Sequence, residues 1–159
     1  MKKLKVGLGS LFTLLVVAAC AAPIGPVPGF LIGGSLANVP DTWGNTLPIH
    51  EVQLQVGNGP IGRTVLIWTV QMDGDLYVLG QKDSRWTQAI GPSGPVRLSM
   101  DGSLYELTAT AVEGGSTKSA VTGAWLRKYE PHYPDLVAGF GTPAEGARKS
   151  TIFRLTRRS

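Results

Sequence analysis

Hydrophobic and polar positions alternate with a period of two along most of the stretch from residue 49 to residue 112, which predicts β-strands. Alternation is clear in 49–57 and 103–112, while 63–72 is β-branched and mostly apolar, as in a buried central strand. Two further strands are predicted at 76–79 and 95–100. The sequence therefore favours a sheet built largely from neighbouring strands.

Two short polar turns join these strands in pairs. Asp73-Gly74-Asp75 separates the second strand from the third, and Asp101-Gly102 separates the next two. Asp-Gly is typical of tight hairpins, because glycine adopts a positive φ at little cost. We therefore expect two β-hairpins at these positions.

The remaining elements are few and short. An apolar stripe within 117–130 predicts a helix that Ser116 would cap, and 81–90 predicts a short helix or turn. Residues 151–156 form a last predicted strand. Six short strands in about 110 residues favour a mostly β fold: a small split β-barrel, six-stranded and of the Greek-key type, with two or three short helices.

The N-terminus has the pattern of an export signal. Lys2, Lys3 and Lys5 precede an uncharged apolar run over 6–19, which is too short to span a bilayer comfortably. The run ends Val17-Ala18-Ala19-Cys20, which resembles the lipobox of bacterial lipoproteins. That resemblance implies a diacylglycerol on the Cys20 sulfur and cleavage before it. The alternative is ordinary cleavage after Ala21 or Ala22, with Cys20 discarded or left as a free thiol.

The mature chain begins with a segment rich in proline and glycine. Residues 20–40 carry no charge and no periodicity, which predicts a tether between the lipid and a domain at 41–159, with residues 1–19 as the signal peptide. Apolar residues in the second half of the tether, among them Phe30 and Leu31, suggest that it packs onto the domain. We expect an envelope protein anchored through Cys20, on the periplasmic face of the outer membrane if the host is Gram-negative.

Charge and composition exclude several classes of function. Of the fifteen Lys and Arg residues three lie in the signal, which leaves twelve against eleven Asp and Glu and a net charge of +1. This balance argues against nucleic-acid binding. A single cysteine excludes a disulfide framework, and neither His50 nor His132 has an acid at a metal-binding spacing, so no metal is expected.

The order of the predicted pieces resembles the split-barrel fold of the pyridoxamine 5′-phosphate oxidase-like, flavin-binding proteins. Together the matching stretches cover most of 39–158. Four stretches carry the resemblance: Val39-Pro-Asp-Thr-Trp43 before the strand over 49–56; Arg63-Thr-Val-Leu-Ile-Trp68 with Asp73-Gly-Asp-Leu-Tyr-Val-Leu79; Asp83-Ser-Arg-Trp86 ahead of Val96-Arg-Leu-Ser-Met-Asp-Gly-Ser-Leu-Tyr-Glu-Leu107; and Leu126-Arg-Lys-Tyr129 with Ile152-Phe-Arg-Leu155.

The resemblance implies a site for the phosphate of flavin mononucleotide (FMN) or a related flavin or deazaflavin. Guanidinium groups suit phosphate, since their forked donors match its oxygens. The larger oxidases carry lysines where this chain has Trp68 and Trp86, so two cationic contacts differ. The implied cofactor-binding residues are Arg63, Thr64, Val65, Lys82, Ser84, Arg85 and Trp86.

Two functions of different class follow from these features. The first is a flavin-dependent oxidoreductase, in which the cofactor performs the redox chemistry and no catalytic side chain is assigned. The second is a non-catalytic ligand-binding or structural lipoprotein that keeps the barrel but not the cofactor. In either case the resemblance implies a homodimer, because a small domain gains apolar burial that way. Alternatives for individual residues are a solvated strand end for Arg63, a polar turn for Ser84 and Arg85, and a core or dimer-interface position for Trp68 and Trp86.

Overall fold

The computed structural model describes residues 28–44, 46–59 and 61–158 of the chain. The predicted signal peptide, Cys20 and residues 21–27 of the predicted tether lie outside this range. Among the described residues, no helix is both long and apolar enough to cross a membrane.

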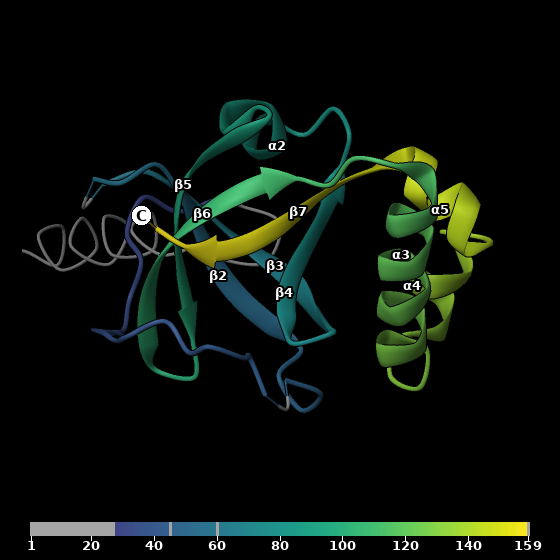
Figure 1. Cartoon of the computed structure of the whole chain (residues 1–159), viewed down its shortest axis with the longest axis horizontal. Coiled ribbons are helices and arrows are strands. Elements are labelled where there is room, and N and C mark those ends of the chain that lie inside the picture. Colours follow the sequence, from purple (N-terminus) through teal and green to yellow (C-terminus); the bar gives the residue numbers. More distant parts are fainter. Residues whose placement is uncertain (1–27, 45, 60, 159) are drawn as a thin grey trace, which may run out of the picture.

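Six antiparallel strands form a closed barrel, because β7 pairs with both β4 and β6. A short β1 adds a parallel edge to β6, and Figure 1 shows the other strands wrapped into the barrel. This arrangement confirms the predicted mostly β barrel. The strands are β1 (Ser35–Leu36), β2 (Glu51–Val56), β3 (Arg63–Met72), β4 (Asp75–Gln81), β5 (Ser93–Met100), β6 (Ser103–Ala111) and β7 (Ser150–Arg157).

The two predicted hairpins are confirmed. Asp73 and Gly74 have φ of 53° and 87°, and Asp101 and Gly102 have φ of 50° and 73°. Two successive positive φ values define the type I′ turn, whose twist matches that of the strands on either side. The local Asp-Gly signal therefore sets the β3–β4 and β5–β6 registers.

Four short helices accompany the barrel in the described part of the chain, rather than two or three. They are α2 (Arg85–Ile90), α3 (Gly115–Tyr129), α4 (Pro134–Ala138) and α5 (Pro143–Lys149). The predicted cap at Ser116 is wrong, since α3 begins at Gly115 and its N-cap is Gly114. The two unpredicted helices, α4 and α5, both carry proline in their first turn, where its missing N–H costs nothing.

The barrel interior is filled by alternate residues of all six strands and closed at one end by α2. Trp86 and Ile90 of α2 are buried in this core, and the Trp86 ring lies 5.9 Å from that of Phe153. Gly80 makes room for the indole, because a Cβ at this position would lie 2.1 Å from its Cζ2 atom. The absence of a side chain at Gly80 on β4 thus lets α2 pack into the end of the barrel.

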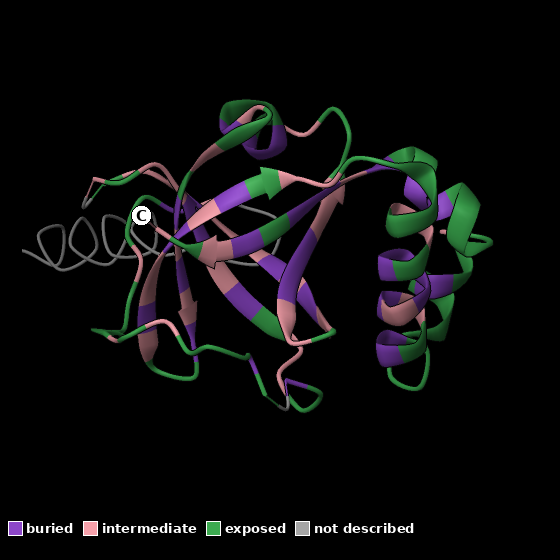
Figure 2. Cartoon of the chain, in the orientation of Figure 1, coloured by how far each residue is buried: buried purple, intermediate pink, exposed green. Residues whose placement is uncertain are grey.

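A second core forms outside the barrel, where α3, α4 and α5 cover β3, β4 and β7. Val121, Trp125 and Tyr129 of α3 are buried against outward-facing side chains such as Val70 and Ile152. Figure 2 shows the buried positions of α3 on one side of the helix and exposed positions on the other. The molecule therefore has two apolar layers, and the strands between them carry apolar side chains on both faces.

Residues 28–43 run along the barrel wall, held by backbone hydrogen bonds and, at the end of the segment, by Trp43, which is buried in the barrel core. Gly29 exchanges two bonds with Thr64, at 2.8 and 2.9 Å, and Ser35–Leu36 pair with β6. Phe30 and Leu31 remain 58% and 48% exposed. The segment is therefore attached by its main chain and by Trp43, and not by these two apolar side chains.

Candidate functional site

A basic cavity lies between the barrel and the helical layer. Its volume is about 520 Å³, and its walls come from the β4–α2 loop, the start of α3, α5 and the start of β7. Lys82, Lys118 and Arg148 are its charged residues, and no carboxylate contributes to the wall. Ser119 and Thr151 add hydroxyl groups. A cavity of this size and charge suits a small anionic molecule.

The three cations of this basic cavity have no ion-pair partner among the described residues. By contrast, Arg154 lies 2.7 Å from Asp75, and Arg157 lies 3.1 Å from Asp41. Like charges that gather without counter-charges repel one another, so their shared location favours an anion. The positive charge of the cavity is therefore available to a ligand.

Two helix starts shape the cavity wall. The α3 helix begins with Gly114 and Gly115, both in the wall, and it has neither a side-chain cap nor an acidic residue in its first turn. By contrast, α5 has a capping box in which Thr142 and Glu145 each bind the other's backbone. These backbone and side-chain hydrogen bonds hold the pKa of Glu145 below its usual value. The capped α5 carries Arg148 into the cavity.

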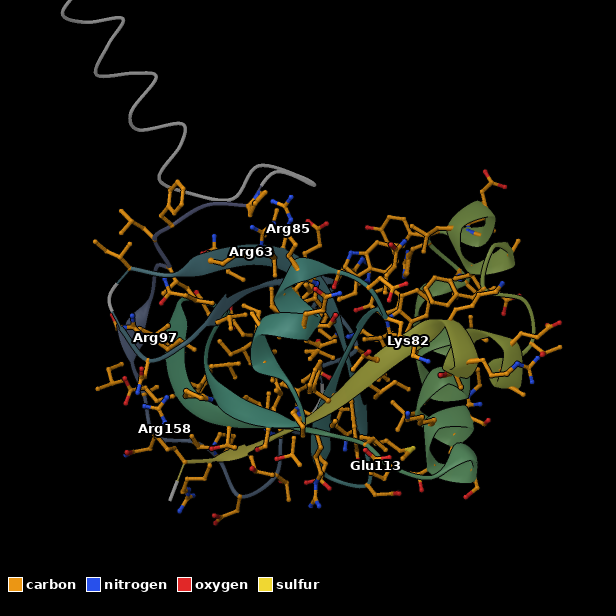
Figure 3. The ribbon with its side chains drawn as sticks, turned by 90° about the horizontal axis from the view of Figure 1, so that it is seen from above. Arg63, Lys82, Arg85, Arg97, Glu113 and Arg158 are labelled. Atoms are coloured by element: carbon orange, nitrogen blue, oxygen red, sulfur yellow. The ribbon has the colours of Figure 1, made fainter. Side chains whose placement is uncertain are left out.

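The structure divides the predicted phosphate-binding residues into two places. Lys82 lines the basic cavity, whereas Arg63 lies on β3 and Arg85 begins α2, both outside the cavity wall (Figure 3). The β3–β4 ladder ends at Thr69–Val78; before this point β3 pairs with β2, and after it β4 pairs with β7. The Nε atom of Arg63 is buried and has no hydrogen-bond partner among the described residues. Arg63 therefore has a buried donor with no described partner, and α2 packs mainly against β5 and β2 rather than β3.

Three other predicted site residues are engaged in packing. Thr64 is fully buried; its backbone bonds to Gly29 and its hydroxyl accepts from Gln55 Nε2 at 3.2 Å. Val65 packs against the barrel core, and Trp86 is buried within it. None of these three side chains presents a free polar group at the surface. The Ser84 hydroxyl is likewise within 3.0 Å of the Thr87 hydroxyl.

A buried polar pair fastens α3 to the barrel. The ammonium group of Lys128 donates to the carbonyls of Ile49 at 2.8 Å and Thr69 at 2.9 Å, and burial lowers its pKa to about 8. The Tyr129 hydroxyl donates to the carbonyls of Thr69 and His50, and burial raises its pKa. Tyr129 lies on the apolar stripe that predicted this helix, whereas Lys128 was not expected to be buried, because a lysine near a helix end usually faces water.

An aromatic cluster covers the outer end of the same helix. Trp68 stacks on Tyr129, with ring centroids 4.4 Å apart, and on Trp125 at 5.5 Å. His50 and His132 lie beside it, with centroids 4.5 Å apart. The part of the chain that the structure describes contains no group of three or more metal-binding side chains. Trp68 therefore fills space between β3 and α3.

Comparisons with known proteins give structural likenesses only. No protein-family model and no curated protein matches the chain. HutZ, the heme storage protein from Vibrio cholerae, is similar over 69% of this chain and 82% of its own, at 13% identity and a TM-score of 0.45. A pyridoxamine 5′-phosphate oxidase-like protein from Listeria innocua is similar over 71% of this chain and 88% of its own, at 16% identity and a TM-score of 0.45.

Proposed function

We propose that this chain is a lipid-anchored envelope protein whose barrel domain binds a small molecule through an anionic group such as phosphate. The observation that carries the proposal is the basic cavity, in which Lys82, Lys118 and Arg148 converge without a carboxylate. Hydrogen bonds from a charged donor to an anion are roughly twice as strong as neutral ones. Three such donors on separate elements can surround one anionic group.

The contents of the basic cavity favour binding over catalysis. Its side chains are cations and hydroxyls, and small residues such as Gly115 and Ala147 leave room beside them. Lysine, arginine and the free N–H groups at the start of α3 are donors, so the wall offers many donors to an anion. This set recognises charge and shape, and it includes no residue assigned to proton transfer.

Titration of the mature, detergent-solubilised protein tests this function. Inorganic phosphate and FMN are added separately, and heat of binding and thermal stability are measured. We expect the double variant Lys118→Gln, Arg148→Gln to lose the binding seen with the original protein. Arg127→Gln is the matched control, because Arg127 is an exposed cation that lies on α3, as Lys118 does, but outside the cavity. Equal binding by the double variant and the control would refute a site in the basic cavity.

FMN held at Arg63, Ser84 and Arg85 is a second candidate. The buried Arg63 Nε without a partner favours it, since a phosphate oxygen would complete that donor, and the exposed Arg85 adds a second guanidinium. Bound flavin would supply electron or hydride transfer, while these residues would grip its phosphate. Arg63→Ala should then abolish FMN binding that the double variant Lys118→Gln, Arg148→Gln retains. The opposite result places the phosphate in the basic cavity.

The anchor and the assembly state complete the proposal. The position of Cys20 after Val17-Ala18-Ala19 supports lipidation and an envelope location. Cys20→Ser should remove the lipid mass from the N-terminal peptide and release the protein from the membrane fraction. We propose a homodimer on the ground of domain size, and analytical ultracentrifugation of the solubilised protein measures it.

A further inference from the structure

An exposed apolar patch lies beside the start of the described chain. Phe30, Leu31 and Ile61 are 58%, 48% and 70% exposed, which is unusual for side chains of this size. They come from two segments that run antiparallel, since Gly29 pairs with Thr64 and the Gly62 N–H donates to the Phe30 carbonyl at 3.0 Å. The three side chains therefore occupy one small region of the surface.

The backbone beneath this apolar patch is firmly attached. Gly29 and Thr64 exchange two hydrogen bonds, and the buried Gln55 side chain donates to the Phe30 carbonyl at 3.0 Å. Gln55 is itself held by Thr64 and by Arg97, whose Nη1 lies 3.3 Å from its Oε1. The apolar side chains are therefore exposed on an ordered support, and loose packing of the segment does not explain their exposure.

We propose that this apolar patch docks on the surface of the membrane in which the protein is anchored. The inference rests on the lipidation of Cys20 that the proposed function includes. Phe30 follows Cys20 by ten residues, so it lies at most about 35 Å from the lipid. Apolar side chains that stay this close to a bilayer gain burial in its interfacial region.

The placement of the patch supports this occupant. Figure 1 shows the N-terminal segment on one side of the barrel and the helices α3, α4 and α5 on the other. Docking through the patch would turn the helical layer, and the basic cavity at its boundary, toward the aqueous compartment.

Site-specific fluorescence in vesicles tests the docking. The lipidated Ile61→Cys protein is labelled with an environment-sensitive fluorophore and reconstituted into phosphatidylethanolamine–phosphatidylglycerol vesicles that carry a shallow nitroxide lipid. We expect blue-shifted emission and quenching at position 61. Leu136→Cys, labelled in the same way, is the matched control, because Leu136 is an exposed leucine of α4 in the helical layer. The emission of the label at position 136 should keep the wavelength that it has in water, and the nitroxide lipid should not quench it.

Each other outcome overturns the proposal. If mass spectrometry finds the lipid on Cys20 but position 61 behaves like position 136, the patch does not touch the bilayer although the anchor exists. If the fluorophore at 61 is shielded without nitroxide quenching and the protein cross-links through that position, a second copy covers the patch. Absence of the lipid itself refutes the anchor, and position 61 then stays unquenched for that separate reason.

Discussion

Arg97 and Arg154 on the barrel wall differ from the cations of the basic cavity in their partners. On the wall, Arg97 and Glu106 face each other across β5 and β6, and Arg154 binds Asp75 across β7 and β4. In the cavity, Lys82, Lys118 and Arg148 form no salt bridge with a described residue, although Arg148 lies near enough to Glu145 to help lower the pKa of that carboxylate. Paired charges stabilise strand neighbours, whereas unpaired charges of one sign keep their binding capacity for a ligand.

The largest expected effect comes from removing the unpaired cations. Loss of a charge-assisted hydrogen bond costs about 1.5–3 kcal/mol, so Lys118→Gln with Arg148→Gln should weaken phosphate binding by about 100-fold or more. The measurement is isothermal titration calorimetry of phosphate with the solubilised protein. An affinity within threefold of the original would show that these cations do not hold the anion.

Lys128 sharpens the comparison, because it is a buried cation held by two carbonyls and by the Tyr129 ring, whose centroid lies 5.1 Å from its Nζ. Its pKa of about 8 in the folded protein lies below its ordinary value of 10.5, so the unfolded chain binds more protons between these two values. Stability should therefore rise as pH increases from about 8 to 10. One pKa unit corresponds to about 1.4 kcal/mol, so even half of this lowering would add about 1.7 kcal/mol.

Urea unfolding between pH 7 and 10 measures this effect. Lys128→Met removes the titrating group and should remove the rise, whereas Lys149→Met, an exposed lysine of α5, should retain it. Above pH 10 the buried Tyr129 reverses the trend, since its raised pKa lets only the unfolded chain ionise. A rise of the same size in Lys128→Met would assign it to another group.

The cap of α5 has a smaller expected effect. Thr142→Ala removes the side chain that accepts from the Glu145 N–H, and loss of such a cap costs about 1 kcal/mol. Because α5 carries Arg148, we expect weaker phosphate binding by a few-fold as well. Thermal unfolding and phosphate titration measure the two effects. The control is Thr117→Ala, because Thr117 is an exposed threonine of α3. If Thr142→Ala lowers stability but leaves phosphate binding unaltered, the cap does not position Arg148 for the ligand.

The smallest effect is expected for a paired cation of the wall. Arg154 is half-exposed, and exposed ion pairs contribute about 0–1 kcal/mol. Asp75→Asn should therefore lower stability by about 0.5 kcal/mol and leave phosphate binding unchanged. Urea unfolding and calorimetry test this. A large loss of phosphate affinity in Asp75→Asn would contradict the division between paired and unpaired cations.

Strands were predictable from the sequence because their signals are local. Period-two alternation and the two Asp-Gly turns identify β2 to β6, and the ends of β3 agree with the predicted residues 63–72. The helices α4 and α5 were missed, since the proline and glycine residues of 131–146 indicate loops when read singly. Their short lengths depend on contacts with α3 and β7 that no local pattern shows.

The candidate site was predictable only in part. Lys82 was identified, but Lys118 and Arg148 join it through the packing of α3 and α5, which depends on the fold as a whole. Trp86 was implied as a site residue by the resemblance, with a core position as the alternative, and the space above Gly80 admits its ring into the core. Adjacent residues of α2 thus have different environments: Arg85 is exposed, whereas Trp86 is buried in the core.

Because β7 closes the barrel beside β6, the three helices of the helical layer form an insertion between two neighbouring strands. β6 and β7 are neighbours, with Ala111 opposite Phe153, so residues 112–149 leave and re-enter the barrel at adjacent points. The entropy cost of closing such a loop grows only slowly with its length. A change in the length of this insert would therefore cost little closure entropy and leave the β6–β7 register in place. Loss of the apolar residues of α3, by contrast, would uncover the outward-facing side chains of β3, β4 and β7.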